Sequence, residues 1–460
     1  MGETEDEAPL YPPAAPAASR ELPLWRAIPA LIRNPLRFVP DTIYRQPLAF
    51  YRRLGIDYAL VADPALVMSV LLGDAAKYEK SALEQDVLGP TMGNGPLTAS
   101  GDLWRWQRKV SAPLFRHGDV LAHVPRMAAS AENQIRLWRE TKLAAGQAHD
   151  IQPAMKDATF DVITSTILAG CTPEEAAVIK RAEEIASKYI QWDILFRLLH
   201  LPAALWYPYK HTLKSAAMDM RAALHVLIWR RKLAGGPPGD ILARLESAVD
   251  PATGAPMSDE LVCDNLATFL EAGHETTALA LTWTIYLLAR SPVWQDRLRE
   301  EAFAVAGQGP IEPGHVERLP LTMRVLKESM RLYPPVPTIV RVVREETILG
   351  GRKLAKGTLV FVLVYATHRH HSLWEDPDRF DPDRFTPDRE RAMKRGQFMP
   401  FGAGHRTCIG MGFALVSAAT MLASFLRAAR FEWDGRHLPE PLNLVNLHPK
   451  GGMPVRLTLL

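Results

Sequence analysis

One cysteine in a glycine-rich segment is the residue best placed to do chemistry in this chain. Cys408 lies in Phe401–Gly410, with Gly402 and Gly404 before it and a predicted helix directly after it. Glycine permits the positive φ of a tight bend, and the free N–H groups at a helix N-terminus stabilise an anionic sulfur. Arg406 could then meet an acidic group on a ligand held by the sulfur. A lone cysteine is more often a buried structural thiol, but that interpretation leaves the regular spacing of its neighbours unexplained.

A second group of polar residues interrupts a long helical pattern. The pattern covers residues 258–290, and a helix of that length spans roughly 45–50 Å. Gly273, Glu275 and Thr276 lie in its middle, although Gly, acidic residues and Thr are poor choices for a helix interior. Thr276 can hydrogen-bond the carbonyl of Ala272 and loosen the helix, and Gly273 leaves space for a ligand near the backbone. The alternative is a solvated helix face that carries Glu275.

Charged and aromatic residues also recur at helical spacing. Glu328 and Arg331 are three residues apart, and Trp104 and Arg108 are four apart, so the members of each pair share a helix face. Taken alone, a Glu–Arg pair of this kind is usually a minor surface salt bridge, and a single Arg is usually solvated. These pairs therefore indicate a function only in combination with other motifs.

The cysteine segment agrees at every specified position with the F-x-x-G-x-R-x-C-x-G signature of the cytochrome P-450 family, which it therefore resembles. Residues 272–277 resemble the family's A/G-G-x-D/E-T-T/S motif, and Glu328 with Arg331 resembles its E-x-x-R helix. The motifs occur in family order, so the resemblance covers the chain from about Leu24 to its end. It implies haem b, with the iron held by the Cys408 thiolate, which pushes electron density onto the metal and favours O–O cleavage.

The resemblance also implies roles for other residues. Thr276 would hydrogen-bond the bound oxygen, and Glu275 would relay the protons that the cleavage of dioxygen consumes. Cationic side chains would bond the haem propionates. The implied haem contacts are Cys408, Arg406, Arg108, Trp104, Arg341, Phe401, Gly402, Gly410 and Ala272. The implied substrate contacts, mostly apolar as an apolar substrate requires, are Leu266, Phe269, Leu270, Val336, Thr338 and Ile339.

A structural network beneath the haem is implied as well. Glu328 and Arg331 would pair with the Arg of a P-E-R-F motif, which here is Pro382–Phe385 with Asp in place of Glu. Arg379 lies in an identical tetrapeptide just before it, and we prefer Arg384 because its lead-in fits the family. The histidines at 368, 370 and 371 could indicate a metal site, but the family commonly has a basic loop here, so we predict a surface loop.

Composition limits the remaining possibilities. The 460 residues are 47% hydrophobic, which is sufficient for a large core. The 54 Lys and Arg nearly balance the 51 Asp and Glu, so the net charge does not indicate binding to nucleic acid. Residues 1–23 are acidic and rich in Pro and Ala, and we predict a disordered tail. Residues 24–460 are predicted to form a single large domain, mainly α with a minor β part, around a buried haem. Residues 24–44 are basic and amphipathic, which indicates a surface helix or, alternatively, a peripheral membrane contact.

Cysteine usage and the absence of long apolar runs bear on location. Three separated cysteines are no disulfide framework, which favours a reducing, cytoplasmic compartment. No uncharged apolar stretch is long enough to cross a bilayer, so no transmembrane segment is expected. We also expect a monomer.

Together these features predict a monooxygenase that inserts one atom of dioxygen into an apolar organic small molecule. We expect no fused flavin or ferredoxin domain, so a separate ferredoxin- or flavodoxin-type donor with its reductase would supply electrons, ultimately from NAD(P)H. A basic face including Arg105 and Lys109 would receive the donor. A haem-thiolate peroxygenase lacks the acid–alcohol pair and a non-catalytic gas sensor needs no proton relay, so Glu275 and Thr276 argue against both alternatives.

Overall fold

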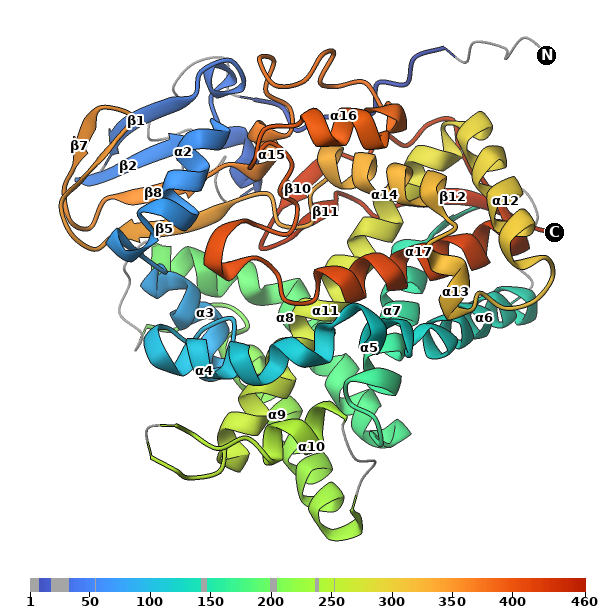
Figure 1. Ribbon diagram of the computed structural model, residues 1–460, viewed down its shortest axis with the longest axis horizontal. Helices are drawn as coiled ribbons and strands as arrows, with labels where there is room; N and C mark the ends of the chain where they lie inside the picture. The colour runs from blue at the N-terminus through green and yellow to red at the C-terminus, as the bar shows by residue number, and fades with distance from the viewer. Residues whose placement is uncertain are drawn as a thin grey trace. The chain divides into compact units, whose positions relative to one another are not determined.

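Helices provide most of the secondary structure and short strands provide the rest, as Figure 1 shows. The computed structural model describes residues 8–17, 33–53, 55–141, 147–198, 205–235, 240–251 and 253–460. Contacts divide the chain into two compact units. The first comprises Met1–Glu79, Met127–Ala158 and Thr276–Leu460, and the second comprises Lys80–Arg126 and Thr159–Glu275.

A five-stranded sheet dominates one part of the first unit (Figure 1). Its strands, in spatial order, are β1 (Leu48–Arg53), β2 (Ile56–Val61), β8 (Leu359–Val362), β5 (Ile339–Val343) and β3 (Tyr78–Glu79). β2 pairs in parallel with β8, and the other neighbours are antiparallel. Val61, Val360 and Val362 are fully buried and form a core with Leu71, because β-branched residues pack well on a pleated surface.

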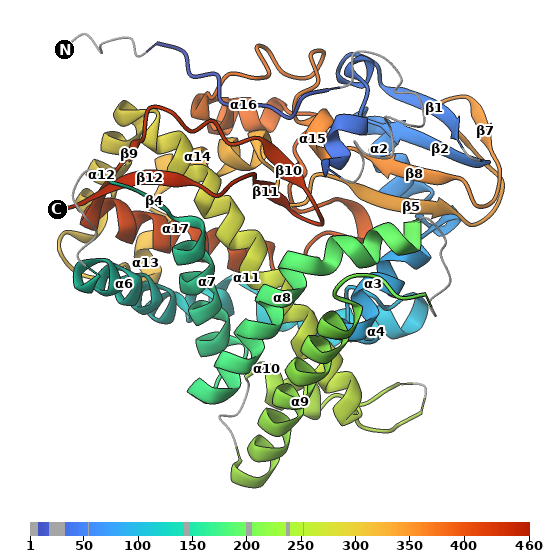
Figure 2. The same cartoon turned by 180° about the vertical axis from the view of Figure 1, so that it is seen from behind.

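Three smaller sheets complete the strands of the first unit, and Figure 2 shows the one built from β4, β12 and β9. The strands are β4 (Ala148–Asp150), β12 (Pro454–Leu459) and β9 (Ala429–Trp433), then β10 (Pro441–Asn443) with β11 (Leu447–Pro449), and β6 (Thr347–Leu349) with β7 (Arg352–Leu354). Strand β8 ends at Val362, where the chain turns into the short helix α15 (Val364–Thr367). In that helix the backbone N–H of Thr367 bonds the carbonyl of Leu363.

Most helices of the first unit lie in the C-terminal part of the chain. They are α2 (Pro64–Met68), α12 (Pro292–Ala306), α13 (Pro313–Val316), α14 (Pro320–Leu332), α15 (Val364–Thr367), α16 (Pro387–Ala392) and α17 (Met411–Ala428). α14 begins with Pro320, and the Glu301 carboxylate accepts hydrogen bonds from the next two amides at 2.7 and 2.9 Å, as suits a helix N-terminus. α17 is long and apolar enough to cross a membrane, but 67% of it is buried in the protein, as in a core helix.

Helices make up the second unit, in which α8 (Pro173–Leu198) packs along α9 (Lys210–Ala234), as Figure 2 shows. The other helices there are α3 (Ala82–Met92), α4 (Gly101–Ser111), α5 (His117–Leu121) and α10 (Ile241–Glu246), while α6 (Val124–Glu140) and α7 (Gln152–Thr166) cross the boundary between the units. Short 3-10 or π turns are η1 (Pro35–Phe38), η2 (Asp41–Tyr44), η3 (Ser69–Gly73), η4 (Ala75–Lys77), η5 (Ala112–Phe115), η6 (Pro382–Phe385) and η7 (Gly404–Arg406).

The predicted central helix is α11 (Asp259–Ala289), which is continuous across the unit boundary at residues 275 and 276. The Ser258 hydroxyl accepts the amide of Leu261 at 3.3 Å, so Ser258 caps the helix. The helix stops just before Pro292, which opens α12 as its first residue. Threonines are accommodated in its interior by bonding back one turn, as Thr282 does to the carbonyl of Ala278 at 2.7 Å.

Within residues 8–17, the N-terminal segment of the first unit is hydrogen-bonded to two tyrosines from the later part of the same unit. The Ala15 amide donates to the Tyr365 hydroxyl at 2.9 Å, and the Tyr333 hydroxyl donates to the Pro13 carbonyl at 2.7 Å. An extended Pro-rich chain leaves its backbone polar groups free, so buried tyrosines can bind them. Residues 8–17 therefore differ from the predicted disordered tail, whose positions 1–7 and 18–23 lie outside the described residues.

The predicted basic helix over residues 24–44 also differs from the structure where it is described. Residues 24–32 lie outside the described residues, and the remainder forms the two short turns η1 and η2. Pro35 opens η1 and Pro40 precedes η2, and each removes a backbone donor that a continuous helix needs. Ile43 and Tyr44 are buried in the first unit.

Candidate active site

The cysteine segment is a tight loop in the first unit that ends at the start of a helix. The Cys408 amide donates to the Phe401 carbonyl at 2.9 Å, and α17 begins just beyond, with Gly410 at its N-cap. Gly404 has a φ of 73°, and a Cβ there would lie 1.9 Å from the carbonyl oxygen of Leu71. No other residue fits this position, so the backbone of the loop is held against η3.

Among the three cysteines, Cys408 alone has an exposed side chain. Cys171 is half-buried and Cys263 is fully buried. Burial raises the pKa of each of these two thiols to about 12, so both stay protonated at neutral pH. Cys408 is therefore the cysteine available to a ligand, and the alternative of a buried structural thiol does not describe it.

Strand β5 brings two predicted contact residues to the cysteine loop. A Cβ on Gly402 would lie 3.5 Å from Cδ1 of Ile339, so the start of β5 lies beside the loop. Arg341 follows on the same strand, half-buried, with its guanidinium donating to the Val340 carbonyl at 2.8 Å. Of the other residues predicted near the substrate in this unit, Thr338 is half-buried and Val336 is exposed.

The middle of α11 is more open than the stretches of the helix on either side of it. Residues 262–270 and 277–289 are buried, whereas Ala272 is exposed and Thr276 is half-buried. Ala272 and Thr276 are four residues apart and so share a helix face. The space beside Gly273 is filled, since a Cβ there would lie 2.8 Å from Cδ1 of Ile163. Room for a ligand is therefore at Ala272, and the prediction that Gly273 provides it is wrong because Gly273 faces α7.

Glu275 and His274 are both held by α8 within the second unit. The Ser187 hydroxyl donates to Oε1 of Glu275 at 3.0 Å. Nε2 of the buried His274 lies 3.2 Å from a carboxylate oxygen of Glu183. Glu275 is half-buried and hydrogen-bonded, so it is not part of a freely solvated face. No motif in the sequence marks Ser187, whose contact depends on how α8 packs.

The remaining predicted residues of the second unit lie on α4 and the first half of α11. The Arg108 guanidinium stacks over the Trp104 ring at 5.9 Å, so these two side chains share a face of α4. Leu266 and Leu270 are fully buried, and the Phe269 ring meets the Phe115 ring edge-on at 5.7 Å.

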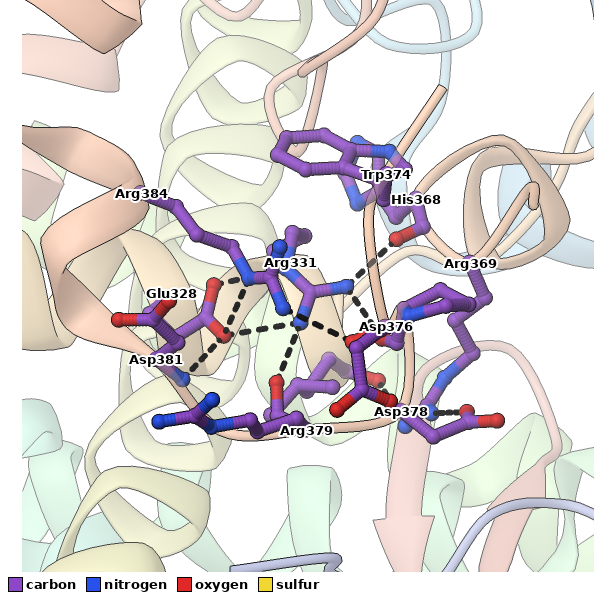
Figure 3. Close-up of polar contacts among 12 residues, drawn as sticks. Glu328, Arg331, His368, Arg369, Trp374, Asp376, Asp378, Arg379, Asp381 and Arg384 are labelled. Atoms are coloured by element: carbon purple, nitrogen blue, oxygen red, sulfur yellow. Dashed lines mark hydrogen bonds and ion pairs between the residues drawn. The ribbon is translucent and has the colours of Figure 1, made fainter. Parts of the chain in front are cut away.

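Figure 3 shows the ion-pair network around Glu328 and Arg331 in the first unit. The guanidinium donates to both carboxylate oxygens at 2.7 and 2.8 Å, and neither side chain is exposed at all. Arg331 also donates to the carbonyls of His368, Pro377 and Arg379 at 2.7 to 3.0 Å. The pair is thus a buried, hydrogen-bonded unit and not a minor surface salt bridge.

Arg384, in preference to Arg379, supplies the third charge of the network. Its Nε lies 3.6 Å from Oε1 of Glu328, and its guanidinium also donates to the carbonyls of Glu375 and Asp376. Arg379 contributes only its backbone carbonyl to Arg331, as Figure 3 shows.

The histidine segment is not the predicted surface loop. His368 is 0% exposed and His370 is 4% exposed, and only His371 reaches solvent. The prediction is wrong because α15 carries this segment into the core, where the His371 amide bonds the Tyr44 carbonyl. Within the described residues, no group of three or more His, Cys, Asp or Glu is arranged to hold a metal ion.

These residues fit a haem. The accessible Cys408 thiol lies at the start of a helix, where a thiolate is stabilised, and Arg406 and Arg341 belong to the same unit, with charges suited to propionates. On the open stretch of α11, the small residue Ala272 lies one turn before Thr276 and on the same helix face as its hydroxyl.

Solved structures define the fold. The crystal structure of the cytochrome P450DA heme domain superimposes with a TM-score of 0.80, covering 97% of each chain at 22% sequence identity. The fold is therefore that of a cytochrome P-450 haem domain, mainly α with a minor β part.

Sequence comparisons define the family. The family model described as cytochrome P-450 matches residues 46–455, and the chain belongs to this family. Similar proteins include cyclooctatin synthase of Streptomyces melanosporofaciens (31% identical, over 91% of this chain and 89% of that protein) and cyclooctat-9-en-7-ol 5-monooxygenase of the same organism (31%, over 93% and 92%). Cytokinin hydroxylase of Arabidopsis thaliana is 31% identical over 81% and 73%. The chain is accordingly an oxidoreductase of the cytochrome P-450 monooxygenase class, and haem iron is the cofactor of its family.

Proposed function

We propose that this enzyme inserts one atom of dioxygen into an apolar organic small molecule and releases the other atom as water. The haem supplies the activation of dioxygen when it is bound. The observation that carries the proposal is the pair Glu275 and Thr276 on the open stretch of α11. The Thr276 hydroxyl would hold a proton at the reacting oxygen, and the Glu275 carboxylate, held by Ser187, would deliver protons to it.

The cysteine loop and three arginines would hold the haem. Cys408 would bind through its sulfur, and Arg406, Arg341 and Arg108 would donate to the propionates. Trp104 would join them, since Arg108 stacks on its ring. The loop and helix residues in contact would be Phe401, Gly402, Gly410 and Ala272.

The substrate contacts would be mostly apolar, which supports an apolar substrate. They would be Leu266, Phe269, Leu270, Val336, Thr338 and Ile339. A screen of apolar compounds for a spin-state change of the haem tests this choice, and cyclooctat-9-en-7-ol belongs in it because one relative is named for its oxidation. Oxygen uptake with a reductase system and a compound from this screen then tests the reaction. Product formed only with hydrogen peroxide would indicate a peroxygenase, and gas binding without product would indicate a sensor.

Thr276→Ala is expected to uncouple electron use from oxidation. Positioned proton transfer contributes about 10²–10⁴-fold to rates, so product formed per NAD(P)H should fall by roughly 10-fold or more, with peroxide released instead. Product, peroxide and cofactor consumption are measured together. Thr282→Ala is the matched control. Thr282 lies on the same helix, but it is buried, and its hydroxyl donates to the carbonyl of Ala278 one turn earlier in that helix. Retained coupling in Thr276→Ala would remove this hydroxyl from the mechanism.

Electron delivery is expected to depend on the basic surface of α4. We propose a ferredoxin- or flavodoxin-type donor with its reductase, ultimately using NAD(P)H. Arg105 and Lys109 are exposed, and electrostatic steering raises association rates by about 10–10³-fold at low salt. The double replacement Arg105→Glu, Lys109→Glu should therefore slow haem reduction by roughly 10-fold and leave the haem spectrum unchanged. Arg391→Glu, another exposed arginine paired with an aspartate, is the control, and normal reduction of the double variant would overturn the proposal.

We also propose that the protein is a cytoplasmic monomer. No disulfide joins the three cysteines in the described part of the chain, which supports a reducing compartment. Sedimentation of the purified holoenzyme tests the oligomeric state, and fractionation of cells tests the location.

A further inference from the structure

Two buried histidines lie close together in the segment after β8, but only one of them contacts the chain that leads into the cysteine loop. His368 ends α15 and is fully buried. Its Nε2 accepts a hydrogen bond from the Met399 amide at 2.9 Å. His370 is nearly as buried, yet its Nδ1 accepts from the amide of Ser372, two residues along the same segment.

The ring of His368 is neutral and has a defined tautomer. Burial and the nearby charge of Arg331 lower the pKa of His368 to about 3, so the ring carries no charge at neutral pH. Because Nε2 accepts the Met399 amide, the single ring proton is on Nδ1. The ring also stacks on Phe398, with centroids 5.3 Å apart. Its position is therefore set by packing on one side and by a hydrogen bond on the other.

His368 joins the buried ion pair to the cysteine loop. On one side its carbonyl accepts the Arg331 guanidinium at 2.8 Å, and Figure 3 shows this bond. On the other side its ring holds the Met399 amide, and the carbonyl of Met399 accepts the amide of Gly402 at 3.0 Å. Phe401 precedes Gly402 in this turn, and its carbonyl accepts the amide of Cys408.

We propose that His368 is a positioning residue for the iron ligand: its neutral imidazole fixes the Met399 amide and, through it, the turn that presents Cys408. The Met399 amide is buried, and an unsatisfied buried donor is unfavourable. Without the imidazole acceptor, a rearranged loop becomes more favourable, because the Met399 amide can then find another partner. The Cys408 sulfur would be displaced by this rearrangement and would no longer bind the metal as a thiolate. This inference rests on the haem-thiolate part of the proposed function, which Cys408→Ala tests separately.

The test compares four holoenzyme variants by the spectrum of the reduced, carbon-monoxide-bound haem, by haem retention and by thermal unfolding. His368→Leu keeps the bulk but removes the acceptor, and the ratio of thiolate-ligated to other haem should fall on the order of 10-fold. His368→Gln places an amide oxygen where Nε2 was and should restore the ratio. His368→Asn is too short to reach the Met399 amide and should resemble His368→Leu. His370→Leu, the matched control, should lower the unfolding temperature but keep the ratio.

Each outcome decides the proposal. A thiolate ratio in His368→Leu equal to that of the unmodified enzyme would overturn it, as would a ratio in His370→Leu that falls equally. If His368→Leu does not fold, the comparison of Gln with Asn decides: a higher ratio for Gln supports the proposal, and equal ratios overturn it. A spectrum without a thiolate band in the unmodified enzyme would instead be a failure of the proposed haem ligation.

Discussion

Replacing Cys408 with Ala is expected to abolish the strongly red-shifted Soret band of the reduced, carbon-monoxide-bound enzyme. A thiolate donates electron density that an imidazole or water ligand does not, and Cys408 is the one cysteine of the three with an exposed sulfur. Monooxygenation should be lost with the band, because the push that favours O–O cleavage is gone. The absorption spectrum of the purified, haem-loaded variant measures the effect.

Cys171→Ala and Cys263→Ala are the controls for this prediction. Both thiols are protonated at neutral pH because burial raises their pKa values to about 12. Each replacement should therefore keep the red-shifted band, although Cys263→Ala removes a fully buried sulfur and should reduce stability modestly. A band that survives in Cys408→Ala, or disappears in either control, would refute the assignment of the ligand.

Arg331→Met is expected to produce the largest loss of stability. Removing one partner of a buried ion pair typically costs about 3–5 kcal/mol, because the other charge stays buried without compensation. Here the loss also leaves the carbonyls of His368, Pro377 and Arg379 without their donor. The variant should unfold at markedly lower denaturant concentration, and it should retain haem poorly. Denaturant unfolding followed by circular dichroism measures the first effect, and the haem absorbance measures the second.

Arg324→Met provides a comparison on the same helix. Arg324 pairs with Asp383 at 3.3 Å, but both side chains are partly exposed. Exposed pairs of this kind contribute about 0–1 kcal/mol, so the unfolding midpoint should move little. Equal destabilisation by the two replacements would show that the burial of the Glu328–Arg331 pair is not the source of its importance.

The buried network and the cysteine loop belong to one continuous part of the first unit. The Arg331 guanidinium and the Met399 amide are both hydrogen-bonded to His368. On the proposal made above, a residue outside the ligand signature therefore sets how Cys408 is held.

Spacing alone was sufficient to predict several local features. The helical pattern over residues 258–290 predicted α11 (Asp259–Ala289) to within one residue at each end, because the Ser258 cap and the missing donor of Pro292 act within one turn. Three-residue spacing placed Glu328 and Arg331 on one face, since helical periodicity is fixed by the backbone. The signature around Cys408 identified the family, which the family model over residues 46–455 shows.

Burial and long-range contacts were decided only by the tertiary structure. The histidines were predicted to lie at the surface, and the packing of α15 buries His368 and His370. Gly273 was predicted to make room for a ligand, but Ile163 occupies that space. Ser187 has no local signal, because its bond to Glu275 exists only when two helices pack together. Local sequence determines which residues share a turn or a helix face, whereas partners many residues away depend on how the whole chain packs.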